Sequence, residues 1–288
     1  GRGIRLVNSR DEFLNAFRSA SGEAQSAFGD GAVYMEKYLN PVKHIEVQIL
    51  CDKFGNVVCL GERECSVQRK NQKLIEESPS PAINEETRAR MMEAAAKAAK
   101  AVNYENAGTI EFLLDGDGNF YFMEMNTRLQ VEHPVTEMVT GIDLVQWQLR
   151  IASGIPLSFN QSDIRLNGHA IECRINAENP DFDFRPSCGR INLLHIPGGP
   201  GVRFETAVYQ DYFVPPFYDS MIGKLVVHGD TRDQAIRKMK TALSELVIDG
   251  IDHNAELQAD ILMDDRFTSG SYTTSFMAER EAERKDEV

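Results

Sequence analysis

The clearest periodic pattern in the chain alternates apolar and polar residues over positions 44–51, HIEVQILC. An alternation with a period of two predicts a β-strand whose two faces differ in polarity. The apolar face would hold Ile45, Val47, Ile49 and Cys51, and the polar face His44, Glu46 and Gln48. Residues 52–56 predict a turn, and residues 57–63 predict the returning strand.

Helices are predicted where a start signal precedes apolar residues at helical spacing. Residues 85–102 follow Asn84, which is a favourable N-cap, and carry acids in their first turn. The motif Ser9-x-x-Glu12 has the form of a capping box and predicts a short helix to about Ala20, followed by a Gly/Ser-rich loop to Gly31. Further helices are expected over residues 143–152 and 231–246.

The remaining strands are expected in hairpins. Residues 109–114 and 120–125 flank the turn sequence DGDG, and residues 168–176 and 190–194 also have strand character. No internal repeat is found. Because hairpins are separated by helices, the predicted fold class is α+β.

Composition and charge mainly exclude certain partners and cysteine roles. The 288 residues are 42% hydrophobic, an ordinary globular composition that suggests one large domain or two. A net charge of −13 argues against nucleic acid or an anionic membrane surface as the main partner. Five cysteines, an odd number with no CxxC pair, favour a reducing cytoplasmic setting over disulfides or zinc. An anionic substrate would therefore need a local metal ion or clustered Arg and Lys.

The DGDG hairpin is the first candidate for chemistry. If its turn has an even length, paired positions sum to 233, so that Leu114 faces Asn119 and Glu111 faces Phe122. Glu111 then shares a sheet face with Glu124 and Asn126, and these oxygens would suit Mg²⁺ or Mn²⁺. The alternative is an ordinary solvated strand face.

A polar run continues directly after this hairpin. Arg128, Gln130 and Glu132 alternate, so an extended segment would place them on one side, with Arg128 suited to a planar anion and Glu132 to general-base chemistry. The alternative is an exposed Arg–Glu ion pair. Pro134 is expected to end the run, and His133 is expected to be structural because no second His follows at the spacing of a zinc protease.

These segments resemble the biotin carboxylase family over essentially the whole chain. The matching segments are VYMEKYL (33–39), HIEVQIL (44–50), ERECSVQRKNQK (62–73), GTIEFLL (108–114), EMNTRLQVEHPVTEM (124–138), GHAIECRINAE (168–178), PPFYDSMIGKL (215–225) and LVIDGIDHN (246–254). The resemblance implies an ATP-grasp fold, an antiparallel sheet with flanking helices, followed by a biotin carboxylase C-terminal domain. It places the C-terminal part of the ATP-grasp domain at residues 1–156, with 1–35 as a remnant of its lid, and the second domain at 168–276.

The resemblance also implies roles for individual residues. For ATP it points to Glu36, Lys37, Tyr38, Leu39, His44, Gln48, Gln68 and Asn71. For the metal it points to Glu111, Glu124 and Asn126, and for bicarbonate to Lys73, Arg128, Gln130, Val131 and Glu132, with Glu132 as the base. Arg174 would bind biotin and stabilise its enolate; its alternative is a strand arginine paired with Glu172 or Glu178.

The activity implied by the resemblance is ATP- and bicarbonate-dependent carboxylation of biotin through carboxyphosphate. The cofactors would be ATP, two Mg²⁺ or Mn²⁺ ions, and biotin on a separate carrier. The partners would be the biotin carboxyl carrier protein, carboxyltransferase subunits and a second copy of the chain, in the acetyl-CoA carboxylase of fatty acid synthesis. Alternatives are the biotin carboxylase part of propionyl-CoA or pyruvate carboxylase, another ATP-grasp ligase such as carbamoyl phosphate synthase, and a non-catalytic docking chain.

The chain departs from the family at two positions and in its extent. Asn71 stands where many members have His, and Pro200 replaces an aromatic residue that some dimeric members use at their interface, although Arg203 is retained. The family's N-terminal domain and ATP-binding lysines are expected upstream of Gly1, and the charged end reads as a natural C-terminus. We therefore expect the 288-residue chain alone to bind ATP poorly and not to turn over.

Overall fold

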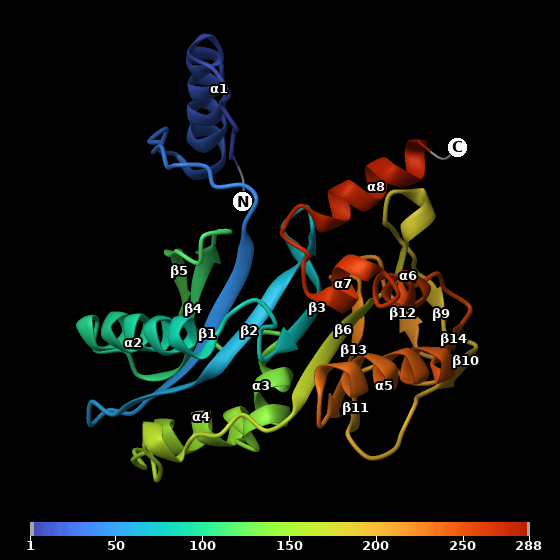
Figure 1. The fold of residues 1–288 in the computed structure, drawn as a ribbon. Helices are drawn as coiled ribbons and strands as arrows, with labels where there is room; N and C mark the ends of the chain where they lie inside the picture. The colour runs from blue at the N-terminus through green and yellow to red at the C-terminus, as the bar shows by residue number, and fades with distance from the viewer. Residues whose placement is uncertain (1–2, 287–288) are drawn as a thin grey trace. The chain divides into compact units, whose positions relative to one another are not determined.

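The computed structural model describes residues 3–286, which form two units, Gly1–Asn40 and Pro41–Val288. The first unit contains one helix, α1 (Arg10–Phe28), drawn in dark blue in Figure 1. Among the described residues, no helix has both the length and the apolar character that a membrane crossing requires.

Helix α1 is longer than the sequence predicted. The predicted end near Ala20 and the loop to Gly31 are wrong, because the helix continues to Phe28 and is capped by Gly29, whose φ is 74°. Only Gly22 in that stretch opposes a helix, and one glycine costs about 1 kcal/mol. The capping box is also incomplete: Ser9 makes no side-chain cap, although Glu12 accepts a hydrogen bond from the Asn8 backbone at 3.0 Å.

The second unit is built on one antiparallel sheet of eight strands in the order β11-β13-β6-β3-β2-β1-β4-β5. In chain order these strands are β1 (Lys43–Cys51), β2 (Val57–Arg69), β3 (Gln72–Ser78), β4 (Asn106–Leu114), β5 (Phe120–Asn126), β6 (His169–Asn176), β11 (Val202–Thr206) and β13 (Met221–Gly229). Short strands pair outside it: β7 (Glu178–Asn179) with β8 (Arg185–Pro186), β9 (Gly189–Arg190) with β12 (Phe213–Val214), and β10 (Leu193–His195) with β14 (Val247–Asp249).

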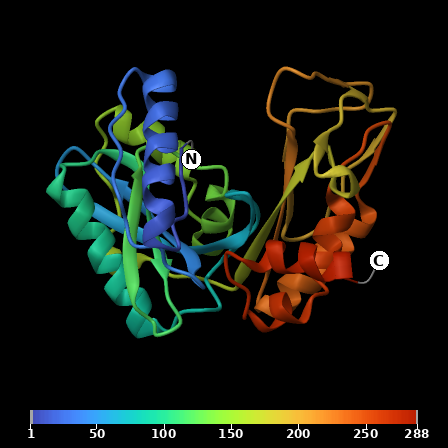
Figure 2. The same ribbon diagram turned by 90° about the horizontal axis from the view of Figure 1, so that it is seen from above.

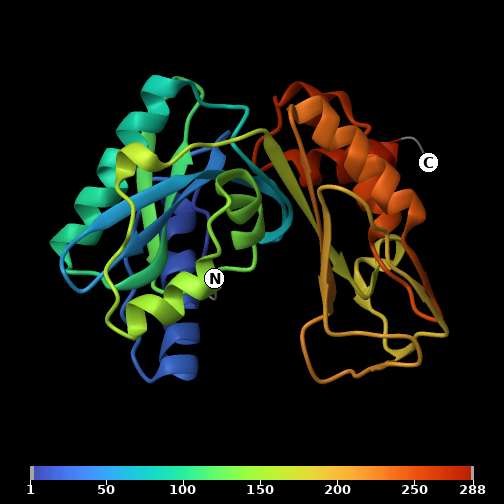
Figure 3. The same ribbon diagram turned by 90° about the horizontal axis from the view of Figure 1, so that it is seen from below.

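Helices cover both faces of the sheet (Figures 1, 2 and 3). The helices of this unit are α2 (Glu85–Ala101), α3 (His133–Thr140), α4 (Leu144–Ala152), α5 (Arg232–Glu245), α6 (Ala255–Ile261), α7 (Asp265–Ser269) and α8 (Phe276–Asp286), with the 3₁₀ turns η1 (Gln161–Asp163) and η2 (Pro180–Phe182). This arrangement agrees with the predicted α+β class. The start of α2 also agrees, since the Asn84 side chain accepts a hydrogen bond from the Thr87 backbone at 2.9 Å.

The core explains why β1 alternates. Its apolar residues pack with Met91, Ala95 and Ala99 of α2 in one cluster. Its polar residues point to the opposite face, but they are buried there rather than solvated. Arg63 bonds Glu46 and Gln48 on this face and is itself bonded to Gln130 and Thr136. The even-numbered side of β1 is therefore a buried polar layer, which requires internal partners for its charges.

Helix α3 was missed from the sequence. Pro134 was expected to end the polar run, but it lies in the first turn of α3, where a proline loses no helical hydrogen bond. The sequence also missed β3 and the far half of β2, which pair with each other as a hairpin through Gln68 and Lys73. This hairpin brings Lys73 to the sheet face that carries Glu46.

Candidate active site

The β4–β5 hairpin places two carboxylates side by side by a different register from the one expected. The loop from Asp115 to Asn119 has an odd length, so Leu114 pairs with Phe120 rather than Asn119. A β-bulge between Glu111 and Phe112 then shifts the register once more, and Glu111 pairs directly with Glu124. The predicted pairing of Glu111 with Phe122 is wrong, but the shared face of the two carboxylates is confirmed.

Asn126 joins these carboxylates into one group. Its Nδ2 donates to Glu111 Oε1 and to Glu124 Oε1, both at 2.9 Å. A partial positive charge therefore lies where the two oxygens converge. A half-turn of the Asn126 amide would replace Nδ2 with Oδ1 and leave only oxygen ligands, which is the donor set that Mg²⁺ or Mn²⁺ prefers. These three residues fit a hard divalent cation.

Two hydrogen bonds fix the orientation of the Glu111 carboxylate. Its Oε2 accepts a hydrogen bond from His44 Nε2 at 2.8 Å, and its Oε1 accepts one from Gln130 Nε2 at 2.6 Å. Burial would raise the pKa of Glu111, but the His44 hydrogen bond and the nearby Lys73 charge outweigh burial and lower that pKa to about 2. The carboxylate is thus ionised and oriented before any ligand arrives.

Glu132 forms the second part of the site. Its side chain is almost fully buried, with Lys73 Nζ in direct contact with Oε1 and Arg174 Nη2 at 3.0 Å from Oε2. Lys73 also pairs with Glu46 at 2.7 Å and lies 3.5 Å from Glu111. One ammonium therefore connects the cation-binding group to the Glu132 carboxylate.

The charges of this cluster stabilise one another. Burial would raise the pKa of Glu46, but Arg63 and then Lys73 outweigh it and lower that pKa to about 2. Burial would lower the pKa of Lys73, but the carboxylates around it outweigh burial and raise that pKa above its usual range. Arg174 behaves in the same way beside Glu76 and Glu132. Glu46, Lys73 and Arg174 are therefore held in their charged forms although they are almost closed to water.

The polar run after β5 does not lie along a single side of an extended segment. Gln130 is buried, where its two ends bond Glu111 and Arg63, whereas Arg128 is exposed and donates to Asn126 Oδ1 at 3.2 Å. Glu132 follows a turn and is the N-cap residue of α3. The alternative considered from the sequence, an exposed ion pair between Arg128 and Glu132, does not occur among the described residues.

Two cations of the site were missed from the sequence. Arg63 is fully buried and donates to the side chains of Glu46, Gln48, Thr109, Gln130 and Thr136. Lys224 donates to the Val131 carbonyl at 3.0 Å and pairs with Glu205 at 2.5 Å. The available signal was weak: each is a basic residue in the apolar pattern of a strand, which requires a buried acidic partner.

The residues expected to bind ATP are distributed over both units. Glu36–Leu39 lie in the first unit, which is described by itself. In the second unit, Gln68 is half-buried and pairs with Lys73 across the hairpin, and Asn71 occupies the exposed hairpin turn with a φ of 65°. The expectation for Gln48 does not fit, because its amide is fully buried and bonds Arg63 and the Gly108 carbonyl.

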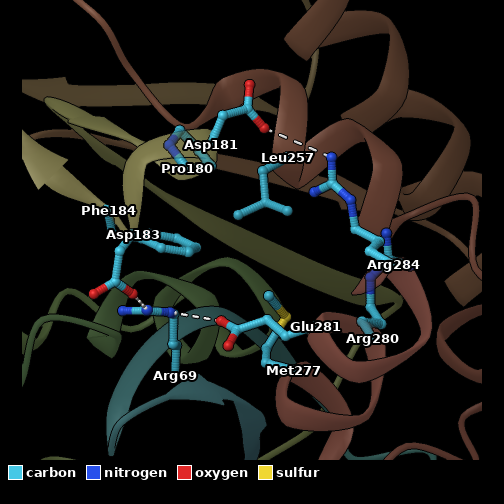
Figure 4. A pocket seen from close by; sticks show the side chains of 10 residues that line it. All are labelled: Arg69, Pro180, Asp181, Asp183, Phe184, Leu257, Met277, Arg280, Glu281 and Arg284. Carbon is cyan, nitrogen blue, oxygen red and sulfur yellow. Dashed lines mark hydrogen bonds and ion pairs between the residues drawn. The ribbon is translucent and has the colours of Figure 1, made fainter. Parts of the chain in front are cut away.

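A separate cavity of about 600 Å³ lies between the start of α8 and the loop that contains η2 (Figure 4). Arg69 pairs there with Asp183 and Glu281, and Arg284 lies 3.6 Å from Asp181. The charges around this cavity neutralise one another, and none of the predicted site residues lines it.

Comparison with known proteins agrees with the fold. Residues 1–160 match the family described as "Carbamoyl-phosphate synthase L chain, ATP binding domain", and residues 172–279 match the "Biotin carboxylase C-terminal domain". Together with the antiparallel sheet and the oxygen-rich cation group, these matches define an ATP-grasp protein. The chain belongs to the biotin carboxylase family.

Individual relatives are similar over nearly the whole chain. The biotin carboxylase of Nostoc sp. is 57% identical over 279 residues, which are 97% of this chain and 62% of the relative. One of the pyruvate carboxylase subunits of Methanothermobacter thermautotrophicus is 53% identical over 97% of this chain and 57% of the relative. A dimer of the biotin carboxylase domain of Hydrogenobacter thermophilus 2-oxoglutarate carboxylase, in complex with MgADP, ADP and bicarbonate, is 48% identical with a TM-score of 0.93, covering 97% of this chain and 62% of that one. The chain thus spans about three fifths of the length of these relatives.

Proposed function

We propose that this chain carries the catalytic residues of a biotin carboxylase, which uses ATP and bicarbonate to carboxylate biotin on a carrier protein. The observation that carries the proposal is the buried Glu132 carboxylate, held between Lys73 and Arg174 and linked through Lys73 to Glu111. A base, two cations and a cation-binding group within one small polar layer suit the activation of a small anion beside a phosphate.

The cation-binding group would hold the nucleotide's metal. Glu111, Glu124 and Asn126 would bind Mg²⁺ or Mn²⁺, with two ions expected, and the ions would neutralise the phosphates of ATP. The residues themselves orient this site, since His44 and Gln130 fix both oxygens of Glu111. His44 would therefore act through Glu111, while Gln68, Asn71 and Glu36–Leu39 would contact the nucleotide.

The anion pocket would lie beside it. Lys73, Arg128, Gln130, the Val131 backbone and Glu132 would bind bicarbonate, and Glu132 would remove its proton. The deprotonated bicarbonate would attack the γ-phosphorus of ATP and displace ADP, and the carboxyphosphate formed would break down to CO₂ and phosphate. Most of the catalysis would come from positioning and charge neutralisation by groups that are already fixed.

Arg174 would bind biotin and stabilise its enolate. In the structure its Nη2 contacts both Glu132, at 3.0 Å, and Glu76, at 2.5 Å. When bicarbonate or its products contact Glu132 in place of Arg174, N–H groups of the Arg174 guanidinium become free to donate to the ureido oxygen of biotin. Phosphate would take the ureido proton, and the enolate would attack CO₂.

The assembly proposed for this function has several members. Biotin would arrive on a biotin carboxyl carrier protein, and carboxyltransferase subunits would use the product, with acetyl-CoA carboxylase and fatty acid synthesis as the setting. The similarity to a pyruvate carboxylase component favours a second candidate, the biotin carboxylase part of that enzyme. A homodimer is proposed through the surface around Arg203, which pairs with Glu137 at 2.7 Å. The five free cysteines, four of them buried, support a cytoplasmic setting.

The proposal is tested in a chimera in which this chain replaces the matching segment of the Nostoc biotin carboxylase. ATP cleavage should depend on bicarbonate and biotin, and Arg174→Ala should reduce biotin carboxylation by orders of magnitude. Arg190→Ala is the matched control, because Arg190 is exposed and pairs only with Asp211 among its described ion-pair partners. Full activity of the Arg174 variant, or ATP cleavage that ignores biotin, would show that the proposal is wrong. The 288-residue chain alone should cleave ATP at a negligible rate.

A further inference from the structure

Two glutamates that have no part in the proposed reaction face each other beneath Arg174. Glu76 on β3 and Glu172 on β6 are directly paired across two adjacent antiparallel strands, which Figure 1 shows side by side. Side chains at paired positions lie on the same face with Cβ atoms about 5 Å apart. Both side chains are fully buried, so neither carboxyl group can be solvated.

Their hydrogen bonds are unequal. Arg174 Nε and Nη2 contact Glu76 Oε1 at 2.6 and 2.5 Å. Glu76 Oε2 and both oxygens of Glu172 have no hydrogen-bond donor among the described residues. Buried carboxylate oxygens are normally paired, so three buried oxygens without a donor, on two residues that are paired across adjacent strands, point to a proton carried by the carboxyl groups themselves.

Among the residues that the structure describes, every cation near Glu172 is already engaged by another partner. On β13, Lys224 is engaged by Glu205 and the Val131 carbonyl, and on β6 itself Arg174 is engaged by Glu76 and Glu132. On α3, which covers this face, His133 bonds the Gln130 carbonyl and Glu137 pairs with Arg203. The other face of β6 packs through Ile171, Cys173 and Ile175 into the apolar core. Burial first, and then the charge of Glu76, raise the pKa of Glu172 well above its usual range.

We propose that Glu172 is a neutral carboxylic acid that shares its proton with Glu76, and that this pair positions Arg174. The shared proton gives Glu76 Oε2 the donor it lacks and leaves one negative charge on the pair. Arg174 then has one fixed buried anion behind it, and its outer edge is directed to Glu132. An ionised Glu172 would compete with Glu132 for the same guanidinium. The inference that this pair positions Arg174 for biotin rests on the proposed function, whereas the inference that Glu172 is protonated does not.

Infrared spectroscopy of the 288-residue chain tests the protonation without turnover. At pH 7 the wild-type spectrum should contain the carbonyl stretch of a protonated carboxylic acid, and Glu172→Gln should lose intensity there. The control is Glu178→Gln, because Glu178 accepts hydrogen bonds from Ser220 and Asn176 and should not contribute to the band. A band that is absent in the wild type, or unchanged in the Glu172 variant, would overturn the proposal.

Unfolding by urea between pH 5 and pH 8 gives an independent measurement. The native wild type would hold a proton that the unfolded chain has lost, so its stability should fall as pH rises. Its unfolding equilibrium constant, divided by that of Glu172→Gln, should increase about tenfold per pH unit until Glu172 ionises. A Gln variant that is destabilised equally at all pH values, or that does not fold, would contradict a neutral Glu172, because the neutral amide has the same size and can donate to Glu76.

The positioning of Arg174 has its own readout. The Nε–H of Arg174 should give a distinct NMR signal because it is hydrogen-bonded and buried, and Arg174→Lys would assign it. Glu172→Gln should keep this signal, whereas Glu172→Leu, which removes the donor to Glu76, should shift it. An unshifted signal in the Leu variant would show that Glu172 does not position Arg174.

Discussion

Replacement of Lys73 by Met offers the sharpest test of how the site is held together. The Lys73 side chain is 11% exposed, and its ammonium contacts Glu132, with Glu46 at 2.7 Å and Glu111 at 3.5 Å. Methionine fills a similar volume but carries no charge. The substitution would leave three nearly buried carboxylates around an apolar side chain, and buried charges without partners are strongly unfavourable.

The expected loss of stability at pH 7 is about 3–5 kcal/mol, the usual cost of removing one partner from a buried ion pair. The pKa values give a consistent figure. Glu46 and Glu111 each fall from 4.5 to about 2, which corresponds to roughly 3 kcal/mol per group. Lys73 accounts for only part of each lowered pKa, because Arg63 also lowers the pKa of Glu46 and His44 also lowers that of Glu111.

The sign of the pH dependence follows from the same values. A carboxylate with a lowered folded-state pKa contributes stability that is present above pH 4.5 and is lost as pH falls toward 2. Without Lys73 the folded-state pKa values of Glu46 and Glu111 rise, so the variant loses less stability than the wild type as pH falls. The difference between wild type and variant should therefore be largest at pH 7 and smaller at pH 4.

Urea unfolding at pH 7 and pH 4 measures this difference. Lys97→Met is the matched control, since Lys97 lies on the exposed side of α2 with Glu93 one turn away and its removal should leave stability unchanged. A loss below about 1 kcal/mol for Lys73→Met, or a loss that is the same at both pH values, would refute the view that Lys73 is the shared counter-ion of this cluster.

Three further outcomes are expected. Arg63→Met should cost about 3–5 kcal/mol in urea unfolding, because Glu46 loses a fully buried partner at 2.5 Å; a near-neutral result would contradict this. Asn84→Ala should cost about 1 kcal/mol through the lost cap of α2, whereas Ser9→Ala should cost nothing comparable, since Ser9 makes no side-chain cap; equal losses would disagree with the observed capping. Glu132→Gln in the chimera should reduce biotin carboxylation by orders of magnitude without unfolding the protein, and unchanged rates at limiting bicarbonate would exclude Glu132 as the base.

The sequence determined much of the β4–β5 hairpin and little of its register. Alternation placed Glu111, Glu124 and Asn126 on one face, and they do lie together. The even-turn register was nevertheless wrong, because the turn is odd and a bulge after Glu111 compensates for it. Side-chain parity is a local property, whereas a bulge depends on how the whole strand fits its neighbours.

The contacts of Glu132 could not be derived from residue patterns. Lys73 and Arg174 lie 59 and 42 positions away from it along the chain and reach it from β3 and β6. Only the family resemblance connected them beforehand. Pattern analysis also left an exposed Arg128–Glu132 pair open as an alternative, because nothing local reveals that α3 begins at His133 and that the Glu132 side chain is buried.

The sequence by itself predicted several of the strands and helices, but not α3, β3 or the full length of α1. It also determined which face of β1 is apolar, and that a net charge of −13 needs local cations to bind an anion. These properties follow from periodicity, capping and composition, which act over a few residues. The tertiary structure alone decided that Arg63, Lys73 and Arg174 share a buried layer with the carboxylates, and that Glu172 faces Glu76 without a cation to spare. The reason is physical: the charge state of a buried group depends on strand order and on the elements that exclude water, and both are settled only when distant segments meet.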